Sequence, residues 1–112
     1  MFKNDKIIIN EIIFVNRSIG NEKGSHTEFK TDHIHYYQLL YKLSGEAIIS
    51  FDRKKVTEKA DNLRFLPNPT DFKYSPLYTA DVVEKGESIN IGFTSYTPLP
   101  KEIIVKSFDN SA

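Results

Sequence analysis

Short strand-like runs, most of them rich in apolar residues, follow one another along this chain, and turn-forming residues separate them. No segment of about twelve residues or more carries a helical stripe of apolar side chains between capping residues, so no long helix is expected. Short runs bounded by regularly spaced turns are typical of strands in a β-sandwich or barrel. The pattern predicts strands at residues 6–15, 37–43, 46–51, 55–57, 62–67, 72–74, 80–84 and 87–94.

The regions between these runs are predicted to be turns and loops. Asn10 and Glu11 interrupt the first run, either as a β-bulge or as a junction between two short strands. Residues 16–31 are polar and contain glycine, which predicts a loop with room for one irregular strand. The prolines in the segment 98–100 are predicted to end the regular structure.

Ser44-Gly45 lies between two apolar runs and is predicted to be a hairpin loop. With a two-residue loop, Tyr41 would face Ile48, and Leu40 would face Ile49. Both faces of this hairpin would be largely apolar, as expected for a sheet that is covered on both sides. One face would carry Gln38, Leu40, Lys42, Ala47, Ile49 and Phe51, and the other Tyr37, Leu39, Tyr41, Leu43, Glu46, Ile48 and Ser50.

Composition agrees with an all-β protein and excludes several classes of function. The 112 residues suit one domain, and β-branched and aromatic residues outnumber the good helix formers. Fifteen basic residues balance fifteen acidic ones, which argues against a surface built to bind nucleic acid. The absence of cysteine excludes disulfides and cysteine-based zinc sites. No apolar run approaches ~18 residues and the N-terminus lacks a signal-peptide pattern, so we expect a cytoplasmic protein that spans no membrane.

Several segments together resemble the N-terminal cupin domain of AraC-type transcriptional regulators. Residues 37–45 are Tyr-Gln-Leu-Leu-Tyr-Lys-Leu-Ser-Gly, where that family has Tyr-Glu-Leu-x-Tyr-x-Leu-Ser-Gly. The turn Asp52-Arg53-Lys54 and the segment 59–67, Lys-Ala-Asp-Asn-Leu-Arg-Phe-Leu-Pro, follow in the same order. Residues 84–89 and 98–100 match later landmarks, so the resemblance covers about residues 6–105. It implies an all-β, cupin-type double-stranded β-helix (a jelly-roll barrel) over residues 1–112.

The resemblance also implies a function. Such domains sense a small-molecule effector and contribute to dimerisation, so we expect a homodimer that binds a small polar metabolite such as a sugar. In the family, DNA is bound only by a helix-turn-helix region that would follow residue 112, and residues 1–112 show no recognition helix. The alternatives are a stand-alone small cupin enzyme, isomerase-like or metal-dependent, and a pure interaction module.

The histidines invite comparison with metal-binding cupins. His33-Ile34-His35 has the His-x-His spacing of a metal site, but the carboxylate position that should follow holds Gln38. The second metal motif of cupins is also altered, with Asp61 in a glycine position and Phe72 in the histidine position. We therefore expect no metal and no other cofactor, with one histidine solvated and the other at the rim of a pocket.

Catalytic patterns are also lacking. A metal-free cupin enzyme needs a base, typically a histidine oriented by a carboxylate. Asp32 and His33 are adjacent, so their side chains cannot meet on a strand. The sequence has no nucleophile elbow and no glycine-rich phosphate loop, so we expect no enzyme and no catalytic residue.

The interior of a small barrel can hold one small ligand. Arg64 is a cation within an apolar run and could pair with a ligand carboxylate or phosphate. The competing interpretations place the aromatic candidates in the core and Arg64 on a solvated edge strand, or assign the domain to dimerisation without any ligand. The predicted ligand-binding residues are Tyr36, Gln38, Phe51, Arg64, Phe72, Tyr74 and His35.

A second apolar face is predicted from Tyr37, Leu39 and Tyr41. Either the isoleucine-rich N-terminal strand or a second subunit would cover this face, because rows of tyrosine and isoleucine are suitable interface material.

Overall fold

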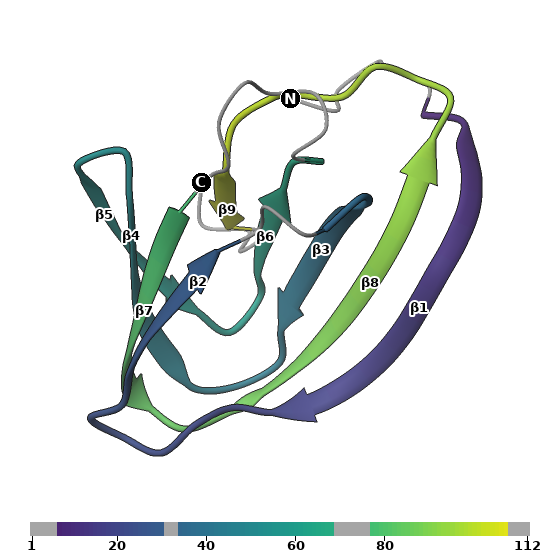
Figure 1. Ribbon diagram of the computed structural model, residues 1–112. Helices are drawn as coiled ribbons and strands as arrows, with labels where there is room; N and C mark the ends of the chain where they lie inside the picture. Colours follow the sequence, from purple (N-terminus) through teal and green to yellow (C-terminus); the bar gives the residue numbers. More distant parts are fainter. Residues whose placement is uncertain (1–6, 31–33, 69–76, 108–112) are drawn as a thin grey trace.

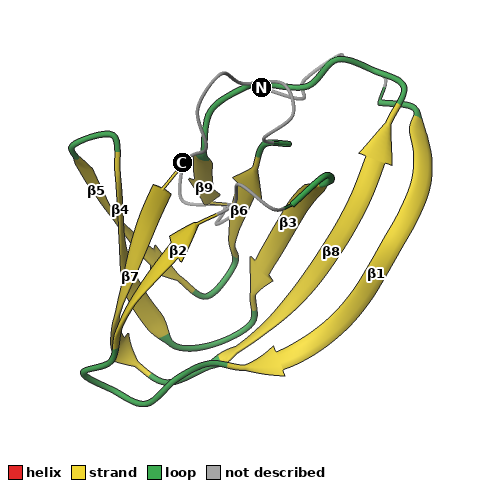
Figure 2. Ribbon diagram, viewed as in Figure 1, coloured by secondary structure: helices red, strands yellow, loops and turns green. Residues whose placement is uncertain are grey.

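The computed structural model describes residues 7–30, 34–68 and 77–107, which form strands, turns and loops without a helix (Figures 1 and 2). All pairs of neighbouring strands are antiparallel. The all-β prediction is therefore confirmed. The strands are β1 (Ile9–Ile19), β2 (His26–Lys30), β3 (Tyr37–Lys42), β4 (Glu46–Phe51), β5 (Lys54–Lys59), β6 (Asn62–Leu66), β7 (Leu77–Glu84), β8 (Glu87–Ser95) and β9 (Ile104–Ser107).

The strands are divided between two sheets that form two layers (Figure 1). The larger sheet has the order β1-β8-β3-β6-β9, and the smaller sheet has the order β2-β7-β4-β5. The connections β1–β2, β3–β4, β5–β6 and β7–β8 each pass from one sheet to the other. This arrangement is a jelly-roll, in which strands that are close in sequence lie in different layers.

The predicted hairpin at Ser44-Gly45 is wrong, because β3 and β4 lie in different sheets. Tyr41 pairs with Leu63 and Ile89, and Ile48 pairs with Thr57 and Asp81, so the predicted cross-strand partners do not meet. The hairpin in this region is instead β4–β5, which turns at Asp52 and Arg53. Both of these residues have positive φ, as a two-residue type I′ loop requires.

Glycine is needed at position 45 not for a hairpin turn but because the β3–β4 connection packs closely against the β7–β8 connection. Gly45 has φ +87°, and a Cβ atom on Gly86 would lie only 1.9 Å from the Ser44 carbonyl oxygen. Leu43 N–H donates to the Glu87 carbonyl at 2.8 Å, so the β3–β4 and β7–β8 connections are held against each other. Two backbones can approach this closely only where no side chain stands between them.

Other sequence predictions differ from the structure at the ends of strands. β1 continues to Ile19, and the irregular pairing between Ile9 and Glu11 confirms the predicted bulge. The predicted loop 16–31 contains β2, which is the single irregular strand allowed for there. β9 follows the proline segment and was not predicted, whereas the predicted strand 72–74 lies outside the described residues.

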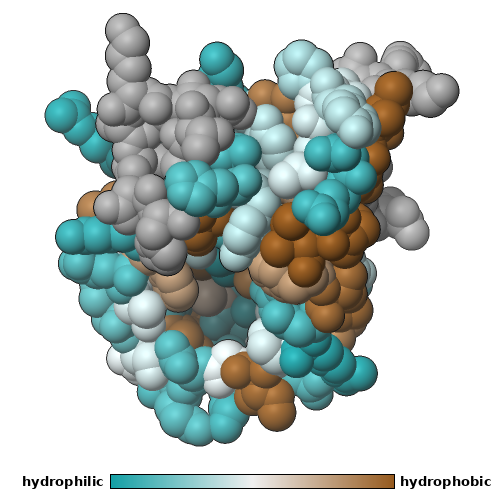
Figure 3. Space-filling model, turned by 45° about the vertical axis from the view of Figure 1, so that its right-hand side comes forward, coloured by the Kyte–Doolittle hydropathy of each residue, from teal (hydrophilic) through white to brown (hydrophobic). Residues whose placement is uncertain are grey.

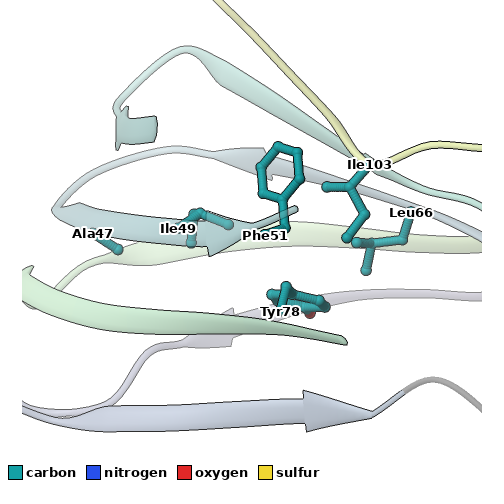
Figure 4. Close-up of a cluster of buried hydrophobic side chains, with 6 residues drawn as sticks. All are labelled: Ala47, Ile49, Phe51, Leu66, Tyr78 and Ile103. Atoms are coloured by element: carbon teal, nitrogen blue, oxygen red, sulfur yellow. The ribbon is translucent and has the colours of Figure 1, made fainter. Parts of the chain in front are cut away.

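The main hydrophobic core lies between the sheets (Figure 4). Phe51 of β4, Leu66 of β6 and Ile103 point into the same space, and the ring of Tyr78 from β7 lies below them in this view. Ile49 is fully buried in this cluster. Because apolar side chains from both sheets meet here, their burial stabilises the packing of one sheet on the other.

The outer face of the larger sheet carries a second apolar cluster. Tyr37 stacks on Phe65, with ring centroids 5.8 Å apart, and Leu99 packs with them. Ile7, which lies just before β1, packs against this cluster, so the predicted cover by the isoleucine-rich N-terminal run is present at this residue but not along β1 itself. Instead β1 pairs with β8 at the edge of the same sheet and extends the face.

This extension leaves apolar side chains uncovered on β1. Ile12 pairs with Phe93 and Val15 pairs with Ile91, so both point to the outer face, where they are 49 % and 62 % exposed. Ile9 and Ile19 are also exposed on β1. Figure 3, which turns this side of the molecule toward the reader, shows hydrophobic surface gathered there. The described part of the chain holds no helix of the length and apolarity needed to cross a membrane.

Candidate functional site

A cavity of about 730 Å³ lies between the two sheets. Its volume falls within the range of small-molecule sites, roughly 300–1,000 Å³. A hollow is visible between side chains in the lower half of the face shown in Figure 3. The apolar part of the wall comes from both sheets and from Ile34 before β3, and its sheet residues are Phe29, Leu40, Ala47, Leu66, Ala80 and Val82.

Neutral polar side chains line the wall formed by the larger sheet. Gln38 on β3 faces the cavity, as do Ser88 and Asn90 on β8. Alternate residues of a strand point to the same face, and Leu40 pairs with Asn90, so these side chains share one surface. The Asn90 side chain donates hydrogen bonds to Asn16 Oδ1 at 3.0 Å and Ser18 Oγ at 2.9 Å. These groups can recognise hydroxyl groups of a ligand without adding charge.

A buried ion pair closes part of the cavity. Arg64 of β6 donates from Nε to Glu58 Oε2 at 2.8 Å and from Nη2 to Glu58 Oε1 at 2.7 Å. Arg64 is 6 % exposed and Glu58 on β5 is fully buried. Because β6 and β5 belong to different sheets, this two-point contact joins the layers directly.

Tyr78 of β7 completes the group around Arg64. Its hydroxyl accepts a hydrogen bond from Arg64 Nη1 at 3.3 Å, and the guanidinium carbon lies 5.3 Å from its ring centroid. Burial disfavours the charge on Arg64, but hydrogen bonding and attraction from Glu58 outweigh burial and raise its pKa. Burial also raises the pKa of the Tyr78 hydroxyl, so this group stays protonated at neutral pH.

Lys42 is the second buried cation of the site. It lies at the end of β3, is 8 % exposed and lines the cavity. Its side chain forms no hydrogen bond and no ion pair within 4.0 Å to any residue that the structure describes. Burial lowers the pKa of the Lys42 ammonium, attraction from Glu58 opposes this shift, and repulsion from Arg64 adds to it.

The structure brings together part of the predicted ligand-binding set. Gln38 and Arg64 line the cavity, but the charge of Arg64 is already paired with Glu58, and Arg64 is not on a solvated edge strand. Tyr36 packs edge-on against Phe14, at 5.5 Å between centroids, and is not part of the cavity wall.

The remaining predicted residues lie elsewhere. Phe51 belongs to the hydrophobic core, as its competing interpretation proposed. His35 is exposed and does not line the cavity, and its carbonyl accepts a hydrogen bond from Asn68 at 3.4 Å. Phe72 and Tyr74 lie outside the described residues.

The described residues contain no group of three histidine, cysteine, aspartate or glutamate side chains placed to hold a metal ion. His33 lies outside these residues. His26 Nδ1 lies 2.6 Å from Asp81 Oδ1, but this pair is exposed where β2 meets β7.

Sequence reasoning missed Lys42, Glu58 and Tyr78 as members of the site. Lys42 has the same strand parity as Gln38, so the alternation already placed the two on one face. Glu58 has the parity of Val56 in a strand that is otherwise polar, which was a weaker signal for an inward-facing carboxylate. The sequence around Tyr78 contains no feature that distinguishes a residue of the site from a residue of the hydrophobic core.

We expect Glu58→Gln to destabilise the protein, because it leaves the buried Arg64 guanidinium without its counter-charge. Breaking one partner of a buried ion pair costs about 3–5 kcal/mol. Urea denaturation followed by circular dichroism measures this change in the free energy of unfolding. Glu22→Gln is the matched control, because the Lys85–Glu22 pair is exposed and should contribute less than about 1 kcal/mol. Equal effects of the two substitutions would contradict the structural role given to Glu58.

Comparison with known proteins identifies the fold. No protein-family model matches this sequence, and no curated protein matches it. Among solved structures, the chain is similar to the EutQ protein of Clostridium difficile, with 16 % sequence identity and a TM-score of 0.51. The match covers 84 % of this chain and 74 % of the EutQ chain. EutQ is a cupin-fold protein, and the two antiparallel sheets described above are consistent with that fold. This chain therefore has the cupin fold, a jelly-roll of the double-stranded β-helix type.

Proposed function

We propose that this chain is the effector-sensing and dimerisation domain of an AraC-type transcriptional regulator. The cavity between the sheets carries the proposal, because its size and its mixed apolar and neutral polar wall suit a small polar metabolite such as a sugar. Gln38, Ser88 and Asn90 supply hydrogen-bonding groups for such a ligand. The residues that resemble the regulator family support the same function.

Binding is favoured over catalysis by the chemistry of the wall. A metal-free cupin enzyme typically uses a histidine that is oriented by a carboxylate. Among the described residues that line the cavity there is no histidine, and the nearby carboxylate of Glu58 is held by Arg64. The stand-alone cupin enzyme therefore remains the second candidate.

The coding sequence after residue 112 separates these two candidates. A regulator requires codons there for helices with a helix-turn-helix pattern, because the described residues contain no recognition helix. Sequencing the gene through this region is the measurement. A stop codon directly after Ala112 would exclude the regulator and favour the stand-alone protein.

Strand β3 offers a route from ligand binding to regulation. Its inward side carries Gln38 and Leu40 in the cavity wall, and its outward side carries Leu39 and Tyr41 on the apolar outer face. A ligand that shifts β3 therefore acts on both faces of the larger sheet. Binding can then change the population of conformers at a subunit interface.

Ligand binding in the cavity can be tested by filling it. We expect a member of a panel of neutral pentoses and hexoses to raise the melting temperature of the wild-type domain, since a ligand at a hundredfold its Kd stabilises the native state by about 2.7 kcal/mol. Ala80→Phe should abolish the rise, because Ala80 lines the cavity. Val83→Phe on the exposed side of the same strand is the control and should retain it. If Ala80→Phe responds like the wild type, the ligand does not bind in this cavity.

The second part of the proposal is a homodimer formed through the outer face of the larger sheet. Ile12 and Val15 extend an apolar face that continues through Ile91 and Leu39. β1 is also an edge strand, so a second copy can bury both its side chains and its free edge. A self-complementary patch of this kind fits a twofold dimer, in which both subunits use the same surface.

We expect multi-angle light scattering to give the mass of a dimer for the wild type and of a monomer for the double variant Ile12→Lys/Val15→Lys. Both side chains are exposed in the single chain, so the variant should keep its fold while losing the apolar contact. Val83→Lys places a lysine on an exposed apolar position of the other sheet and should remain a dimer. A monomeric wild type at high protein concentration would contradict the dimer.

A further inference from the structure

We propose that the cavity selects a small organic anion with a single carboxylate, and that the Lys42 ammonium binds this carboxylate. The inference rests on the proposed ligand-binding function and adds the chemical class of the ligand. It starts from a buried cation that has no counter-charge in hydrogen-bonding range within the described residues.

The two buried cations of the site have different surroundings. Arg64 meets Glu58 through two hydrogen bonds and donates a third to Tyr78, so its donors are largely used within the protein. Lys42 faces the cavity with all three ammonium hydrogens available. The free buried cation of this wall is therefore Lys42 rather than Arg64, the residue to which the sequence assigned this role, whereas Lys30 is exposed.

The charge balance of the cavity indicates how much charge a ligand should carry. Glu58 compensates Arg64, and Glu28 and Lys30, which also line the cavity, carry opposite charges. Lys42 is thus left as one uncompensated positive charge. Burying a charge without a partner is unfavourable, so a ligand with one negative charge relieves an existing cost, whereas a dianion would introduce a new one.

The neighbours of Lys42 suggest how the rest of the ligand is held. Ser88 is directly opposite Lys42 on β8, and Asn90 and Gln38 lie further along the same wall. Val82 and Ala47 on the facing sheet supply apolar contact. A carboxylate next to Lys42 would therefore place the body of the ligand between neutral polar groups and an apolar surface.

Isothermal titration calorimetry with matched pairs of compounds tests this inference. D-glucuronate is compared with D-glucuronamide, and hexanoate with hexanamide, so that each pair differs only in the carboxylate charge. The first pair has a hydroxylated body and the second an apolar body. We expect the preferred acid to bind about tenfold to a hundredfold more tightly than its amide, as a charge-assisted hydrogen bond in a buried site implies.

Lys42→Met should remove this preference while leaving the affinity for the amide unchanged, because the methionine keeps most of the apolar stem. Lys42→Gln provides a second variant of similar length if the first does not fold.

Lys59→Met is the control, because Lys59 is exposed and does not line the cavity. Its affinity for the acid should stay within about twofold, since an exposed charge is screened by water and salt. In the wild-type protein, adding the acid should also shift the NMR signal of the Lys42 Cε methylene.

The inference is wrong if the wild-type protein binds acid and amide with equal affinity, or if it binds neither acid. It is also wrong if both Lys42 variants still prefer the acid, or if inorganic phosphate binds to the wild type more tightly than the acids do. If neutral sugars bind to the wild type but not to Ala80→Phe while the acids gain no advantage, the proposed ligand-binding function stands and only the carboxylate inference fails. If Ala80→Phe binds every probe as the wild type does, the cavity itself is not the site.

Discussion

The interior of this jelly-roll depends on the buried contact between Arg64 and Glu58. Arg64 comes from the larger sheet and Glu58 from the smaller one, so their two hydrogen bonds join the layers at a fixed separation. Two charges that would be very costly to bury singly are tolerated because each satisfies the other. Tyr78 contacts Arg64 and is also a member of the hydrophobic core, so it connects the polar and apolar parts of the interior.

This arrangement explains why the space between the sheets is partly filled and partly open. Toward Phe51, Leu66 and Ile103, apolar side chains fill the interior. Elsewhere between the sheets, the cavity wall carries Gln38 and Lys42, whose polar ends would be unsatisfied if the sheets closed on them. Polar residues in the interior therefore preserve a cavity that a fully apolar core would have eliminated.

The short runs bounded by turns were sufficient to predict most of the strands but not how the strands are assembled. The runs that became β4, β6 and β8 were predicted to within about two residues because each is a short, mostly apolar run bounded by turn-forming residues. The connection at Ser44-Gly45 was mistaken for a hairpin because a glycine with positive φ serves a tight turn and a sheet crossing equally well. Only the tertiary packing of Gly86 against Ser44 distinguishes these two cases.

The site was predicted less completely for the same reason. Arg64 was identified as a candidate, but its pairing with Glu58 depends on how the chain crosses between the sheets from β5 to β6.

The crossing connections also have a consequence for how this chain folds. Among the described strands, β4 and β5 form the one pair that is both consecutive in sequence and hydrogen-bonded, whereas β1 must find β8 and β2 must find β7. Such partners are separated by long stretches of chain, and the entropy of closing these loops must be lost before their contacts contribute. The β4–β5 hairpin is thus the local element on which the other strands can assemble. Until β8 arrives, both backbone edges of β1 remain open to other chains, so slow assembly and exposure to self-association follow from the same topology.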